Sequence, residues 1–111
     1  MIHLVYKTNI YLNIDKAYAI RIVPELNLLS ISYEQDTCII KILEHSKVRE
    51  FLEKYEGDKD EMAKHIMFEV FDIILERLSK TDEKRSSFFY LESLLNTIVY
   101  ELSQNEENEN E

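Results

Sequence analysis

The first part of the chain alternates between apolar and polar residues, which is the pattern of a strand with one buried face. Residues Leu4 to Ile14 place leucine, tyrosine and isoleucine on one side and lysine and asparagine on the other, and we expect a single half-buried strand. Asp15 is a suitable N-cap for a short helix over Lys16 to Val23. Pro24 is expected to end that helix.

A second alternating segment predicts a hairpin. Leu28 to Glu34 and Thr37 to Leu43 both alternate, and the two residues between them are enough for a turn. From Ser46 onward the apolar spacing becomes helical. We expect Ser46 to cap a helix that Gly57 ends in the left-handed conformation.

Two longer helices are predicted for the rest of the chain. Asp58 and Glu61 have the spacing of a capping box before a helix over about Asp60 to Lys80, and a last helix covers about Ser87 to Ser103. The first of them has two apolar stripes. One stripe consists of Met62, Ile66, Val70, Ile73 and Ile74, and the other of Phe68, Phe71, Leu75 and Leu78. Such a helix is either central to the fold or shared with another chain.

The predicted order is therefore β-α-β-β-α-α-α. This is an α+β fold in which a small N-terminal antiparallel sheet precedes three helices, the last two long and packed together or at a dimer interface. With 111 residues, 45% of them hydrophobic, the chain is expected to form one domain over residues 1–103. Residues 104–111 contain only Gln, Asn and Glu, and we expect them to form a disordered acidic tail.

The composition excludes several classes of chemistry. A single glycine rules out the glycine-rich loops of Walker-type and dinucleotide-binding sites. Cys38 is the only cysteine and suits a reducing cytoplasm. His65 shares a helix face with Glu61 and Glu69, a set that can bind a metal but is more often a solvated polar stripe. We expect a cytoplasmic protein without catalytic residues, metal or cofactor, and without a signal peptide or membrane span.

The net charge of −9 argues against a protein that binds nucleic acid on its own. Four cations near the connection between the last two helices depart from this background. They are Arg77, Lys80, Lys84 and Arg85. These residues are candidates for contacting a phosphate or an acidic partner, and weak nucleic-acid binding through them is the most that we expect. The alternative is that they only oppose the helix dipole and solvate the loop.

Seven tyrosines and five phenylalanines favour an interface, because tyrosine suits surfaces that are apolar at one end and wet at the other. A well-filled core is the alternative explanation. The candidate interface residues are Phe68, Phe71, Leu75, Leu78 and Tyr90. A charge substitution at Phe71 is expected to dissociate a dimer without unfolding the sheet.

The first half of the chain, about residues 4 to 55, resembles a known family. The segments that carry the likeness, in the order strand, helix, hairpin, helix, are Asp15 to Ile20, Pro24-Glu25, Leu29 to Tyr33, Cys38 to Ile42 and Val48 to Leu52. They are similar to the small dimerising subunit of the KEOPS complex. The resemblance implies a non-catalytic protein that dimerises and assists the tRNA threonylcarbamoyladenosine machinery by docking onto its catalytic subunit.

Two functions are thus expected from the sequence. The first is an accessory or assembly subunit that forms a homodimer and docks onto a larger complex. The alternative is a small acidic inhibitor or regulator, encoded by a virus or a host, that binds a nucleic-acid-handling protein by mimicking nucleic-acid charge. The acidic residues concentrated between Glu34 and Glu61, together with the acidic tail, favour the alternative.

Overall fold

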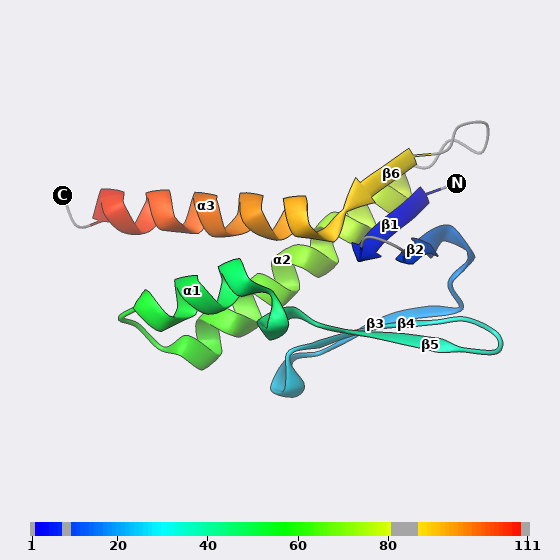
Figure 1. The fold of residues 1–111 in the computed structure, drawn as a ribbon, viewed down its shortest axis with the longest axis horizontal. Helices are drawn as coiled ribbons and strands as arrows, with labels where there is room; N and C mark the ends of the chain where they lie inside the picture. The colour runs from blue at the N-terminus through cyan, green and yellow to red at the C-terminus, as the bar shows by residue number, and fades with distance from the viewer. Residues whose placement is uncertain (1, 8–9, 81–86, 110–111) are drawn as a thin grey trace.

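The protein has an α+β fold, which a computed structural model describes for residues 2–7, 10–80 and 87–109 (Figure 1). Within these residues the strands form two three-stranded sheets, ordered β2-β1-β6 and β3-β4-β5. Three α-helices complete the described part of the chain, and α3 carries the C-terminus away from the sheets (Figure 1). The predicted fold class is confirmed, but the strands are more numerous than expected and fall into two sheets.

The first sheet joins the beginning of the chain to its last third. β1 (Ile2–Lys7) pairs antiparallel with β2 (Ile10–Asn13) and parallel with β6 (Ser87–Tyr90). The single strand expected over residues 4–14 is therefore wrong, because the chain reverses and continues as a second strand. Neither glycine nor proline marks this reversal in the sequence, and the apolar alternation runs across it.

The second sheet is antiparallel throughout. It consists of β3 (Ala19–Val23), β4 (Leu28–Ser32) and β5 (Thr37–Lys41), so the hairpin expected from the sequence is confirmed as β4 and β5. The helix expected over residues 16–23 is wrong. A short 3-10 turn over Ile14–Lys16 is followed directly by β3. Isoleucine and valine, which make up most of β3, are restricted in a helix but pack well on a sheet.

Asp15 has a different role from the N-cap that the sequence predicts. Its Oδ1 accepts a hydrogen bond of 2.7 Å from the backbone N–H of Ile2 and so ties the start of β1 to the turn after β2. This hydrogen bond holds the pKa of the Asp15 carboxyl below its usual value, because it favours the ionised form.

Among the residues that the structure describes, the left-handed residue is Asn27 rather than Gly57. Asn27 has a φ of 54° and follows a 3-10 turn that begins at Pro24 and leads into β4. Gly57 has no positive φ, so the expected conformation is wrong. A Cβ at this position would lie 2.7 Å from the ring of Tyr55, so a larger residue would require the end of that side chain to shift.

The helices follow the sequence pattern more closely than the strands do. α1 covers Ser46–Lys54, α2 covers Lys59–Ser79 and α3 covers Leu91–Glu109. Ser46 is the first residue of α1 and not its cap, since His45 occupies the cap position without a side-chain hydrogen bond. The last helix starts later than expected because residues 87–90 form β6. It also continues through residues 104–109, which the sequence assigns to a disordered tail, and residues 110–111 lie outside the described residues.

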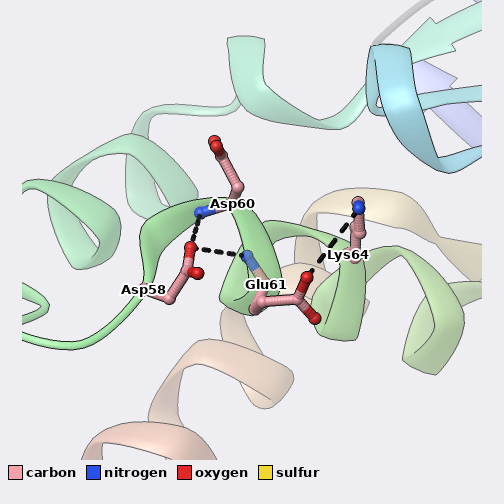
Figure 2. Close-up of polar contacts among 4 residues, drawn as sticks. All are labelled: Asp58, Asp60, Glu61 and Lys64. Atoms are coloured by element: carbon pink, nitrogen blue, oxygen red, sulfur yellow. Dashed lines mark hydrogen bonds and ion pairs between the residues drawn. The ribbon is translucent and has the colours of Figure 1, made fainter.

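Asp58 caps α2 as the sequence predicts (Figure 2). Its Oδ1 accepts hydrogen bonds from the backbone N–H groups of Asp60, at 3.1 Å, and Glu61, at 3.2 Å. The Glu61 carboxylate does not complete the capping box. It lies 3.8 Å from the Lys64 ammonium one turn further along the helix. The carboxylates at this end also suit the positive end of the helix dipole.

Replacing Asp58 with alanine is expected to lower the free energy of unfolding by about 1 kcal/mol, because two helix N–H groups lose their acceptor. Asp60→Ala is the matched control, since it removes a neighbouring carboxylate but keeps the cap. Chemical denaturation monitored by circular dichroism compares the two variants. An equal loss from both would mean that local negative charge, and not the cap, stabilises this end of α2.

One hydrophobic core connects the two sheets with all three helices. α2 is central to it, since it contacts α1, α3, β3 and β4. Ile66, Val70 and Ile74 on its first apolar stripe are at most 1% exposed. No polar or charged side chain is buried within the described residues. The sheets are also joined directly, because the Tyr33 hydroxyl donates a hydrogen bond of 3.1 Å to the backbone oxygen of Asn13.

Candidate interaction surface

The outer face of the first sheet is unusually rich in exposed aromatic residues. Leu4 and Phe89 point into the core, at 0% and 7% exposed, so their neighbours along β1 and β6 project to the other side. The strand register brings these outward positions together. They are His3, Val5, Tyr11, Phe88 and Tyr90, and we call this set the aromatic face.

The rings of the aromatic face support one another. The Phe88 ring stacks on the His3 ring with centroids 4.9 Å apart, and it meets the Tyr11 ring edge-on at 6.3 Å. Val5 pairs with both tyrosines of the face and is only 6% exposed. The ring contacts therefore link His3, Phe88 and Tyr11 across the three strands of the sheet.

Despite these contacts, the aromatic face remains open to solvent. Tyr11, Phe88 and Tyr90 are 57%, 53% and 55% exposed. Three aromatic side chains exposed to this degree present on the order of 300 Å² of surface. An area of that size is within the range of about 300–600 Å² that is typical of the largest apolar patch on a monomer, and such patches are often functional.

A cleft of about 360 Å³ runs beside β6 and extends this surface. Its walls come from α2, β6 and the first turns of α3, through Ile73, Arg77, Phe88, Phe89, Tyr90, Ser93, Leu94 and Thr97. The Arg77 guanidinium lies 5.6 Å from the centroid of the Phe89 ring and makes no ion pair within the described residues. The cleft thus combines apolar walls with one uncompensated positive charge.

The interface residues expected on α2 form a separate ridge. Phe68 and Leu75 are 48% and 44% exposed, while Phe71 and Leu78 are partly buried and pack against the core. A charge at Phe71 would therefore lie against the core as well as the surface. Phe71 is for this reason a poor position for testing a dimer without disturbing the fold.

Tyr90, which was expected to share an interface with the four residues on α2, does not lie on that ridge. Tyr90 lines the cleft together with Arg77. On a helix of 3.6 residues per turn, Arg77 lies about 160° around the axis from Leu75. The five candidate residues thus divide between two surfaces on different sides of α2.

The predicted basic cluster is also divided. Arg77 lines the cleft beside the aromatic face. The Lys80 ammonium lies 2.8 Å from the Glu76 carboxylate, and this hydrogen bond lowers the pKa of Glu76. Lys84 and Arg85 lie outside the described residues. Of the four cations, only Arg77 is shown at the candidate surface.

Sequence reasoning missed Phe88 and His3 as surface residues. Their role depends on the parallel pairing of β6 with β1, which joins segments more than 80 residues apart along the chain. The local signal was the run of three aromatic residues before α3. Phe88 and Tyr90 are exposed, and Phe89 between them is buried. Such alternation is typical of a strand with one buried face.

The possible metal site on α2 has the geometry of a surface pair. His65 Nε2 lies 3.9 Å from the Glu69 carboxylate, and both side chains are about half exposed. Over residues 2–7, 10–80 and 87–109, no group of three or more histidine, cysteine, aspartate or glutamate side chains is arranged to hold a metal ion. Nor does any helix in the described part of the chain combine the length and apolar character needed to cross a bilayer.

Comparison with known proteins does not assign the chain to a family. The chain matches no protein-family model, no curated protein and no solved structure. The resemblance to the small KEOPS subunit therefore stays a prediction. One of the elements on which it depends, the helix after the first strand, is the strand β3 in the structure.

Proposed function

We propose that the protein is a non-catalytic interaction module that forms a homodimer through the aromatic face. The observation that carries this proposal is the cluster of three aromatic side chains, each more than half exposed, on one face of a rigid sheet. Apolar clusters of this kind stabilise association when they are removed from water, and aromatic residues are enriched in the centres of interfaces.

The distribution of charge supports a second copy of this chain as the occupant. The aromatic face carries no aspartate, glutamate, lysine or arginine, although the chain as a whole has a net charge of −9. Two copies can therefore meet at this face without burying like charges. A two-fold dimer needs only one self-complementary patch.

The cleft beside β6 supplies the polar rim that such an interface requires. The exposed aromatic area alone is smaller than the roughly 800 Å² per partner of a standard interface. Arg77 at the edge of the patch offers a positive charge to the carboxylates of the second copy. We infer an interface with the aromatic face at its centre and the Arg77 cleft at its rim.

Docking of the dimer onto a larger complex in the cytoplasm is part of the proposal. The resemblance to the small dimerising KEOPS subunit supports it, and a sequence with a single cysteine, Cys38, suits a reducing compartment. The ridge of Phe68 and Leu75 on α2 remains exposed when the aromatic face is covered, because it lies on the other side of the helix. That ridge is the surface that we assign to the larger partner.

Size-exclusion chromatography with light scattering tests the dimer directly. We expect the mass of two chains at low micromolar concentration, and little change between low and high salt, since apolar burial is not screened. A monomer at every concentration and salt would contradict the proposal. That outcome would favour the alternative function, an acidic inhibitor of a nucleic-acid-handling protein.

A further inference from the structure

A second cleft, of about 460 Å³, lies on a different part of the molecule, between the end of β5 and the start of α3. Its floor is apolar and formed by core side chains that are at most 4% exposed: Ile40, Ile42, Leu91 and Leu95. Clefts of this volume with a largely apolar floor and a few polar groups are typical of small-molecule sites. None of the residues of the aromatic face lines this cleft.

The polar rim of the β5-α3 cleft has an excess of negative charge. Glu44 and Glu92 contribute two carboxylates, and Lys41 contributes one ammonium. The Lys41 ammonium lies 3.9 Å from the Glu44 carboxylate, so these two charges largely offset each other. Glu92 makes no ion pair within the described residues. It is the acidic residue in the first turn of α3, where a negative charge interacts favourably with the helix dipole.

His45, at the same rim, adds no positive charge near neutral pH. Burial lowers its pKa below the ordinary value of 6.5, while the nearby Glu92 carboxylate raises it and the Lys47 ammonium lowers it. The Nδ1 atom of His45 is also buried without a hydrogen-bond partner within the described residues. The ring is therefore neutral at pH 7, and the charge that a ligand meets in the cleft is that of Glu92.

We propose that the β5-α3 cleft binds a small organic cation, a primary amine attached to an aromatic or branched aliphatic group. The apolar group lies on the floor of isoleucine and leucine side chains, and the ammonium donates hydrogen bonds to the Glu92 carboxylate. An apolar molecule without charge loses the ion pair, and an anion is repelled by Glu92. This assignment does not depend on the dimer, because the two surfaces share no residues.

Titration of the full chain with phenethylamine, followed by two-dimensional NMR, tests the assignment. We expect saturable shifts at Leu95 and Ile40, with a dissociation constant of roughly millimolar order for a ligand of this size. Phenethyl alcohol and phenylpropionate are the neutral and anionic matched probes, and both should bind more weakly than the amine. Equal binding of all three probes, or no saturable shift at the floor of the cleft, would overturn the proposal.

Variants of α3 separate a specific site from general attraction to an acidic protein. Glu92→Gln is expected to weaken the binding of phenethylamine by about threefold or more, as is typical of an exposed ion pair, and to leave phenethyl alcohol unaffected. Glu101→Gln is the control, because it removes one negative charge from an exposed position of the same helix. It should leave the binding of both phenethylamine and phenethyl alcohol unchanged. Similar weakening by the two variants would show that only the net charge matters and would refute the site. Circular dichroism confirms that both variants are folded.

Discussion

Phe88→Glu is expected to convert the dimer to monomer, with a dissociation constant weakened by at least about 100-fold. Phe88 connects the aromatic face, because its ring contacts the rings of both His3 and Tyr11. Truncation of a central aromatic residue commonly costs about 2 kcal/mol or more. A two-fold dimer contains the substitution twice, so the loss is doubled, and the two new carboxylates are brought near each other. Light scattering or sedimentation equilibrium measures the effect.

Tyr100→Glu is the matched control for this substitution. Tyr100 is 65% exposed on α3, ten residues along the chain from Tyr90 and away from the sheet, so the variant adds the same charge without touching the aromatic face. It should dimerise as the wild type does. Because Phe88 is itself more than half exposed, Phe88→Glu should retain the circular dichroism spectrum of the folded protein. Dissociation by Tyr100→Glu, or an unchanged dimer with Phe88→Glu, would exclude the aromatic face as the interface.

The parts of the fold that the sequence predicted correctly are those with strong local signals. The hairpin of β4 and β5 alternates clearly, and the beginning of α2 has a side-chain cap at Asp58. Both signals depend on residues close together in the chain. The helical spacing of the two apolar stripes likewise predicted a central helix or one shared with another chain, and in the structure Ile66, Val70 and Ile74 on the first stripe are buried.

The elements that were wrong depend on contacts between distant segments. A helix over residues 16–23 satisfied the local cap and the following proline. In the structure Ile20 and Ile22 are partly buried against the core, in a strand that pairs with β4 and contacts α2. The strand β6 was not predicted from the sequence, for a similar reason. A four-residue strand is stable only because β1 lies beside it, and nothing near residue 87 reveals that neighbour.

The candidate site was only partly predictable for the same physical reason. The number of aromatic residues favoured an interface, with a well-filled core as the alternative, and Tyr90 was named as an interface candidate on that basis. It cannot indicate which of them share a surface, because that depends on the sheet order β2-β1-β6. Once β6 is placed beside β1, the alternation of side chains assigns Phe88 and Tyr90 outward and Phe89 inward.

Alanine substitutions on the two apolar stripes of α2 are expected to differ strongly in their effect on the free energy of unfolding, and both can be measured on the same helix. Ile66→Ala is expected to lower the free energy of unfolding by about 2–5 kcal/mol, since the side chain is 0% exposed and its loss leaves a cavity in the core. Leu75→Ala should cost less than about 1 kcal/mol, because Leu75 is 44% exposed and alanine favours the helix.

Thermal and chemical denaturation of the two variants at equal protein concentration provides the measurement. For a chain of this size the Ile66→Ala loss corresponds to a fall in Tm of about 10 °C or more, whereas Leu75→Ala should remain within a few degrees of the wild type. Dimerisation should be retained by Leu75→Ala, since Leu75 lies on the other side of α2 from the aromatic face. Equal destabilisation by both variants would mean that the ridge of Phe68 and Leu75 is buried in the protein in solution. The second stripe of α2, and not the sheet, would then be the interface between the two copies.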